Sequence, residues 1–173
     1  MNIKNNKRKR ESIEKIEKVF IELLQTNALD KISVSEICKH TGLNRSTFYA
    51  NFIDIYDLAD KTKKHLEDEF LTLYSDEISG KTSTDNFLKL FGHIKENQLF
   101  YKTYFKLVTD NNTFIGYDRL RAEKLFDSKY IDYHIEFFRS GFNAIIKKWL
   151  SNGCKETPEE MENILKSEYL RKF

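Results

Sequence analysis

Hydrogen-bonding side chains crowd one short stretch of the chain, "NRSTFYAN", residues 44–51. An arginine can donate two parallel hydrogen bonds to the edge of a guanine, so Arg45 is a candidate for reading a base. Hydroxyl and amide groups suit phosphate oxygens, and Thr47, Tyr49 and Asn51 offer them here. These residue types fit contact with a nucleic acid if the stretch is a helix with its polar side exposed.

The residues around this stretch predict two short helices joined by a tight turn. Ser33 and Glu36 form a capping box that starts the first helix. Gly42 stands where a helix often ends in a left-handed conformation. Asn44 can cap the second helix, which we expect to run to about Asn51. This order of elements is typical of a helix-turn-helix unit.

Apolar residues and charge favour the same interpretation without deciding it. Phe48 and Phe52 are four positions apart, so both lie on the face that anchors the helix. Residues 1–50 hold 10 Lys and Arg against 6 Asp and Glu, whereas residues 51–100 hold 6 against 10. A local basic excess fits phosphate-backbone binding, and it also fits an ordinary solvated face. Many all-α proteins contain such units and never bind DNA.

The composition favours an all-α fold. The 173 residues include only 6 Gly and 1 Pro, few for a fold of strands and turns. Residues 1–12 are polar and basic and are expected to form a loose arm. Asp54 and Pro158 suit the starts of two helices. Apolar periodicity predicts helices at about 12–25, 54–75, 84–96, 98–109, 117–126, 130–151 and 158–170.

The sequence carries no sign of export or of a membrane span. The N-terminal segment is basic and has no apolar region after it. No stretch approaches the roughly 18 apolar residues that a membrane span needs. Cys38 and Cys154 lie far apart, and neither has a CxxC neighbour. We therefore expect a reduced, cytoplasmic protein with no membrane partner.

The stretch "TGLNRSTFYANF", residues 41–52, resembles the signature of the TetR/AcrR transcriptional regulators. That signature reads approximately A-G-V-S-x-G-T-L-Y-x-H-F, and Gly42, Thr47, Tyr49 and Phe52 match it outright. The resemblance covers roughly residues 10–65. It implies an N-terminal helix-turn-helix DNA-binding domain and a C-terminal helical domain that binds an effector and dimerises.

The resemblance also implies roles for single residues. Base contacts fall to Arg45, Ser46 and Ala50, and phosphate contacts to Thr47, Tyr49 and Asn51. We add Ser35 and Lys61 to the DNA-binding candidates. One departure stands out: the family usually has a phosphate-clamping lysine near the start of the fourth helix, where this chain has Ile55. That contact is either lost or supplied by Lys61, by a neighbouring lysine or by the basic N-terminal segment.

Aromatic residues multiply in the C-terminal half and could line an amphiphilic pocket. A buried tyrosine needs a partner for its hydroxyl, which an effector could supply. The alternative is that these residues belong to the core and its boundary. The candidates for the effector pocket are Tyr101, Tyr104, Phe105, Tyr117, Tyr130 and His134.

The helix expected from Tyr130 has two apolar faces, one for the core and one for a partner. One face steps by four and three residues, as in a coiled-coil seam. The resemblance implies a homodimer through the last two helices. The stretch "FFRSGFNAIIKKWLSNGCKETPEEMENIL" is also similar to a subgroup of dihydroxyacetone kinase regulators, some of which act by partnering another protein. The predicted dimer interface comprises Ile135, Phe138, Phe142, Ile145, Trp149, Met161 and Ile164.

The sequence gives little support to the hypothesis that the protein is an enzyme. The four histidines show no metal spacing, and there is no glycine-rich phosphate loop or nucleophile elbow. We predict no cofactor, no metal and no catalytic residue. We expect an all-α protein with a DNA-binding domain at 1–54 and an effector and dimerisation domain at 55–173. It would be a homodimeric, ligand-responsive repressor that reads a near-palindromic operator in double-stranded DNA.

Two other functions stay open. The first is a co-regulator that acts mainly by protein–protein contact, with weak or no DNA binding of its own; Ile55 in place of lysine is its best support. The second is a small-ligand carrier or enzyme built on the aromatic C-terminal half.

Overall fold

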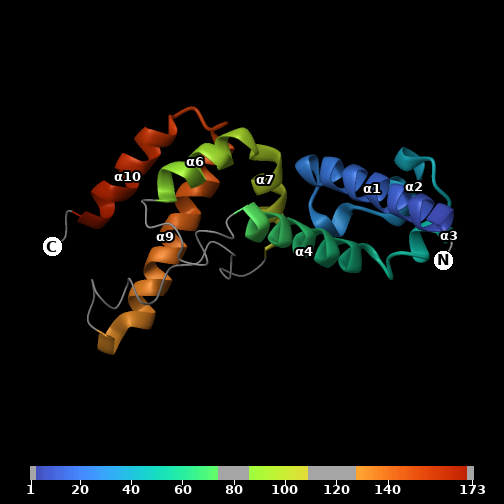
Figure 1. Ribbon diagram of the computed structural model, residues 1–173, viewed down its shortest axis with the longest axis horizontal. Helices are drawn as coiled ribbons and strands as arrows, with labels where there is room; N and C mark the ends of the chain where they lie inside the picture. Colours follow the sequence, from blue (N-terminus) through green and yellow to red (C-terminus); the bar gives the residue numbers. More distant parts are fainter. Residues whose placement is uncertain (1–2, 74–85, 109–127, 171–173) are drawn as a thin grey trace. The chain divides into compact units, whose positions relative to one another are not determined.

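The computed structural model describes residues 3–73, 86–108 and 128–170, and within these ranges every regular element is helical (Figure 1). This confirms the all-α fold. The helix expected at 117–126 lies outside the described residues. The elements are α1 (Ile3–Thr26), η1 (Leu29–Lys31), α2 (Val34–Thr41), α3 (Arg45–Tyr49), α4 (Ile55–Leu73), α6 (Asn86–Glu96), α7 (Gln98–Leu107), η2 (Ser128–Tyr130), α9 (Ile131–Ser151) and α10 (Pro158–Leu170).

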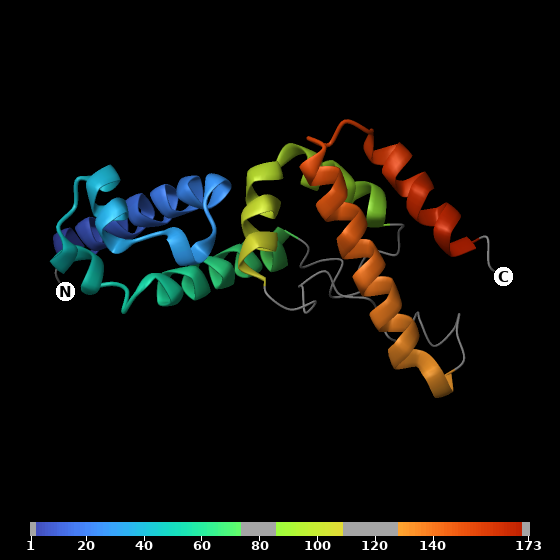
Figure 2. The same ribbon diagram turned by 180° about the vertical axis from the view of Figure 1, so that it is seen from behind.

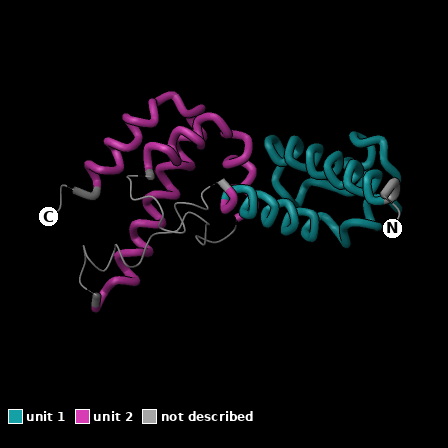
Figure 3. The backbone as a smooth tube through the Cα atoms, in the orientation of Figure 1, with its two compact units in different colours: residues 1–70 teal, residues 71–173 magenta. Residues whose placement is uncertain are grey.

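The chain divides into two compact units, Met1–Phe70 and Leu71–Phe173 (Figure 3). The first unit contains α1 to α3 and most of α4. The most deeply buried residues of its core are at most 3% exposed. These include Ile16, Phe20, Leu24, Ile37, Phe48, Phe52 and Leu58. On α1 the apolar residues recur every four positions, which is why one face of this helix packs against α2.

The basic N-terminal segment is helical, and the prediction of a loose arm is wrong. α1 begins at Ile3, well before the expected start near Ser12. Ion pairs four residues apart support this extension: Lys7 Nζ lies 4.0 Å from Glu11 and Arg10 Nε lies 3.6 Å from Glu14. The consequence is that the basic residues of this segment have fixed positions on a helix.

The turn between α2 and α3 follows the local chemistry. The Ser33 hydroxyl accepts a hydrogen bond from the Glu36 amide at 3.2 Å and so caps α2. Gly42 has φ of +70° and its amide donates to the Cys38 carbonyl, as predicted. Asn44 precedes α3 but its side chain makes no capping hydrogen bond, contrary to expectation. Its backbone carbonyl instead accepts from the Thr47 amide at 2.9 Å.

The second unit is held together by aromatic contacts between α6 and α9. The ring of Phe142 on α9 lies 5.4 Å from Phe87 and 5.9 Å from Phe91, both on α6. The Trp149 indole meets Phe91 edge to face at 5.6 Å. α10 packs along α6, and α7 packs against α9 (Figure 2).

This core takes up four of the seven residues predicted for the dimer interface. Phe138, Phe142, Trp149 and Met161 are between 2% and 7% exposed, so they are already covered by this chain's own helices. Of the remaining predicted residues, Ile135 and Ile145 are half-buried, and Ile164 is 43% exposed. The seven-residue repeat does not by itself distinguish a core from a partner surface, because burial inside the chain and burial against a partner produce the same apolar pattern.

Candidate nucleic-acid interface

α3 presents its polar residues to solvent, whereas Phe48 on α3 and Phe52 just after it face the core. Phe48 is fully buried and Phe52 is 3% exposed, while Ser46 and Ala50 are exposed and Tyr49 is 57% exposed. Helical spacing explains the division, because residues four apart lie above one another on one side. The short helix therefore has one anchored side and one free side.

A shallow, widely open groove of about 470 Å³ runs beside α3, and α1 forms its other wall. Its lining joins predicted residues of α3 and the following turn to the basic segment of α1. The lining residues are Arg8, Lys9, Ser12, Ser46, Thr47, Ala50 and Asn51. Four of the predicted DNA-binding residues thus meet in one groove with two cations.

The two cations of the groove differ from their neighbours on α1. Lys7 and Arg10 pair with Glu11 and Glu14, as described above. Across the described part of the chain, Arg8 and Lys9 have no acidic partner within 4 Å. Because unpaired cations beside hydroxyl and amide groups suit phosphate oxygens, this wall of the groove favours an anionic ligand.

Arg45 is held by the preceding helix. Its guanidinium donates a hydrogen bond to the Ser35 hydroxyl on α2. Both residues were predicted to contact DNA, and the structure brings them together. Since a guanidinium has five donors in a rigid fork, the bond to Ser35 leaves others available and restricts the direction in which they point.

Asn51 has a different arrangement from the one expected of a free phosphate donor. Its Nδ2 donates to the Thr47 carbonyl at 2.8 Å, which ties the side chain to the end of α3. Its Oδ1 is buried and has no hydrogen-bond partner among the described residues. An amide has two N–H donors, so one can still be offered to the groove.

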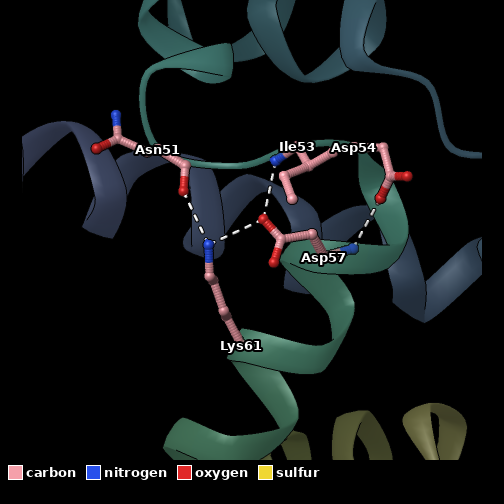
Figure 4. Close-up of polar contacts among 5 residues, drawn as sticks. All are labelled: Asn51, Ile53, Asp54, Asp57 and Lys61. Carbon is pink, nitrogen blue, oxygen red and sulfur yellow. Dashed lines mark hydrogen bonds and ion pairs between the residues drawn. The ribbon is translucent and has the colours of Figure 1, made fainter.

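A compact set of polar contacts follows α3, where the chain turns into α4 (Figure 4). Asp54 accepts a hydrogen bond from the Asp57 amide at 2.8 Å and so caps α4, as predicted. The Asp57 carboxylate accepts from the Ile53 amide at 2.8 Å and pairs with Lys61 Nζ at 2.8 Å. Lys61 Nζ also donates to the Asn51 carbonyl at 3.1 Å. We call these contacts the α3–α4 clasp: Asp57 and Lys61 on α4, with the Asn51 carbonyl and the Ile53 amide.

The clasp has an electrostatic consequence for Asp57. The ammonium of Lys61 and the amide of Ile53 hydrogen-bond the ionised carboxylate, so the pKa of Asp57 lies below its usual value. Asp57 is therefore ionised at neutral pH. The stability that this carboxylate contributes is present above its unfolded-state pKa and is lost only as the pH falls through the lowered value.

Ile55, which stands where the resembled family has lysine, is 8% exposed and belongs to the core. This side chain cannot contact a phosphate. Lys61 is half exposed, but two of its three donors serve the clasp. Arg8 and Lys9 of α1 instead line the groove beside α3 and have no acidic partner among the described residues.

The predicted effector residues are divided between the core and the surface. Tyr101 and Tyr104 are fully buried, and the Tyr101 hydroxyl lies 2.8 Å from His93 Nδ1. Tyr130 is 49% exposed, while Phe105 and His134 are half-buried. Tyr117 lies outside the described residues. A buried Tyr101 whose hydroxyl has a partner within the protein fits the alternative that these aromatic residues belong to the core.

Sequence reasoning offered the basic N-terminal segment as a whole without singling out Arg8 and Lys9, and it missed Asp57. The signal for the first two was the i, i+4 charge pairing of residues 7–14, which predicts a helix where an arm was expected. The signal for Asp57 was its spacing, three residues after Asp54 and four before Lys61.

Within residues 3–73, 86–108 and 128–170, neither a metal centre nor a membrane span is found. No group of three or more His, Cys, Asp or Glu side chains there could hold a metal ion. None of the described helices is both long and apolar enough to cross a membrane.

The fold and the groove define a helix-turn-helix protein with a separate helical unit. Comparison with known proteins supplies the family. The family described as "Transcriptional regulator C-terminal region", of the TetR type, matches residues 81–167, half of the chain. The chain therefore belongs to the TetR family of transcriptional regulators.

A relative from Lactococcus lactis subsp. lactis (strain IL1403) is named "HTH-type dhaKLM operon transcriptional activator DhaS". It is 32% identical over 122 residues, which are 69% of this chain and 64% of that protein. The match thus spans less than two thirds of the relative's length.

Proposed function

We propose that this regulator binds double-stranded DNA with α3 in the major groove and the N-terminal part of α1 against the phosphate backbone. The groove between α3 and α1 is the observation that carries the proposal. One wall supplies unpaired cations, and the other supplies the small polar side chains of a helix with an exposed outer side. In helix-turn-helix proteins the second helix enters the major groove while flanking elements contact the backbone.

The roles of the α3 residues follow from where their side chains lie. Arg45, steadied by Ser35, is proposed to read a guanine edge. Ser46 and Ala50 are exposed at the groove and are proposed to meet base edges. Thr47, Tyr49 and Asn51 are proposed to contact phosphates, with Arg8 and Lys9 replacing the cation that Ile55 does not provide.

The double variant Arg45→Ala/Tyr49→Ala tests this proposal. Both side chains are exposed on α3, so we expect folding to be retained and sequence-selective DNA binding to be lost. A bidentate arginine is worth roughly 1–3 kcal/mol of discrimination, or about 5- to 150-fold. The measurement is selection of bound fragments from sheared genomic DNA by the wild type and the variant. A wild type that enriches no two-fold symmetric site at low salt contradicts the proposal.

We also propose that the protein is a homodimer through the outer side of α9 rather than through its buried seam. Tyr133 is 78% exposed and Phe137 is 75% exposed, and Gly141 and Ala144 continue the same stripe toward the end of the helix. A Cβ added at Gly141 would meet nothing within 4 Å, so another helix has room there. Contiguous exposed apolar residues of this kind mark protein interfaces.

The variant Phe137→Asp tests the dimer. Burying an unpaired carboxylate between two subunits is costly, so we expect the dimer to dissociate at least tenfold more readily. Analytical ultracentrifugation over a range of concentrations measures this. The matched control is Leu88→Asp on α6, an apolar residue that is 39% exposed outside the stripe. A wild type that sediments as a monomer at all concentrations contradicts the proposed dimer.

The direction of regulation has two candidates. Family resemblance favours a repressor released by a small effector, whereas the relative from Lactococcus is named an activator. An effector would act by binding one of two conformations more tightly. A reporter gene behind the enriched site decides the direction, since supplying the protein lowers expression for a repressor and raises it for an activator.

A co-regulator that works by protein contact is the second candidate function. The burial of Ile55 favours this function, because Ile55 stands where the family usually has a phosphate-binding lysine and its side chain lies in the core. Binding to random duplex separates the two, because a DNA-binding protein shows a steep salt dependence of affinity and a co-regulator does not.

A further inference from the structure

The α3–α4 clasp joins two segments that must keep a fixed relation for α3 to read DNA. α3 is only five residues long, and the chain leaves it through residues 50–54. A short helix contributes little stability of its own, so its orientation depends on contacts with its neighbours. Phe48 and Phe52 anchor its inner side, and the clasp is the polar contact at its C-terminal end.

Each member of the clasp satisfies a backbone group of this connection. Lys61 Nζ donates to the Asn51 carbonyl at 3.1 Å, as a cation does at the C-terminal end of a helix. Asp57 accepts from the Ile53 amide at 2.8 Å. The two side chains are bonded to each other at 2.8 Å, one turn apart on α4. Lys61 Nζ also lies 5.3 Å from the centre of the Phe52 ring.

This geometry differs from the one expected if Lys61 bound a DNA phosphate. The sequence suggested Lys61 as a phosphate ligand. Its ammonium is instead directed at a carbonyl and a carboxylate of its own domain. Asp57 is only 22% exposed at its side chain, which makes the pair more sheltered than the ion pairs of α1.

We propose that Asp57 and Lys61 are positioning residues that hold the end of α3 against α4, and that DNA affinity depends on this hold rather than on contact between Lys61 and phosphate. The inference rests on the proposed DNA-binding function. This role predicts the opposite of simple electrostatics for Asp57. Removing a negative charge near DNA should by electrostatics alone raise the affinity for DNA. If Asp57 is a positioning residue, its removal lowers affinity.

The test compares five full-length variants with the wild type: Asp57→Ala, Lys61→Met, the combination of these two, and the matched controls Asp60→Ala and Lys64→Met. Asp60 and Lys64 are exposed residues of the same helix that take no part in the clasp. The probe is a duplex of about 30 base pairs that the wild type has enriched from a random library. Affinity is measured by fluorescence anisotropy at several salt concentrations.

We expect Asp57→Ala and Lys61→Met each to weaken binding about tenfold, because charged hydrogen bonds are lost in both. The combined variant should be no weaker than the worse single variant, since both changes break one unit. The salt slope should stay that of the wild type. Asp60→Ala should bind as tightly as the wild type or more tightly.

Two DNA-binding results overturn the proposal. One is Asp57→Ala binding like Asp60→Ala. The other is Lys61→Met lowering the salt slope by about 0.9, the value for one phosphate contact, with an effect that adds to that of Asp57→Ala. In that case Lys61 is a phosphate ligand.

Amide hydrogen exchange separates this inference from the proposed function. In the free protein we expect the Ile53 amide to exchange at least tenfold faster in Asp57→Ala and Lys61→Met than in the wild type and Asp60→Ala. If the wild type binds no duplex, the proposed function fails. In that case the exchange rate of the Ile53 amide alone tests whether Asp57 and Lys61 position the end of α3. Equal exchange rates in the wild type and all variants overturn that role. If Asp57→Ala does not fold, Asp57→Asn replaces it, because it keeps an acceptor for Ile53 and loses only the ion pair.

Discussion

Replacing Phe48 by alanine is expected to destabilise the first unit by about 3–5 kcal/mol. Phe48 is fully buried on α3, and its ring lies 5.5 Å from both Tyr49 and Phe52. The cavity left by the ring cannot be filled by neighbours that are themselves packed. Urea denaturation followed by circular dichroism measures the loss. A change below about 1 kcal/mol contradicts the view that Phe48 is the anchor of α3.

The control for this prediction is Ile53→Ala, four positions from Tyr49 and 80% exposed. Its loss removes little buried surface, so the free energy of unfolding should change by no more than about 0.5 kcal/mol. The chain has one tryptophan, Trp149, which is buried in the second unit. Its fluorescence reports unfolding of that unit and so separates a loss confined to the first unit from a loss in the whole chain.

Replacing Arg8 and Lys9 together by alanine is expected to lower the salt slope of DNA binding by about 1.8, or 0.9 for each phosphate contact removed. The physical reason is that each bound phosphate releases counterions when a cation neutralises it. Both residues line the groove beside α3, and neither is paired with an acid in the described part of the chain. The measurement is the logarithm of the association constant against the logarithm of salt concentration, with the enriched duplex.

Lys18→Ala/Lys31→Ala is the matched control, because both lysines are exposed in the first unit and neither lines the groove. It removes the same charge from the domain. A general electrostatic attraction would lower the slope equally in both variants. An equal fall would place the phosphate contacts elsewhere, whereas a fall confined to Arg8 and Lys9 supports α1 as the backbone-binding element.

The sequence by itself determined the local structure around α3. The Ser33 hydroxyl, Gly42 and Asp54 mark helix ends, because each acts on backbone groups within four residues of itself. The same holds for the long helices, whose apolar periodicity depends only on spacing. The family signature at 41–52 is also local, and it gave the correct family.

Only the tertiary structure decided which apolar faces are covered within the chain. The seam through Phe138, Phe142 and Trp149 faces α6, while Tyr133 and Phe137 on the same helix face outward. Both faces are apolar in the sequence, so their roles depend on which other helix lies beside them. Likewise, Lys61 bonds to Asn51 and Arg45 to Ser35, each ten residues away. The groove between Arg8 and Asn51 joins segments more distant still. Spacing along one helix predicts the neighbours that a single helix supplies, whereas these contacts exist only once α1, α2, α3 and α4 have packed together.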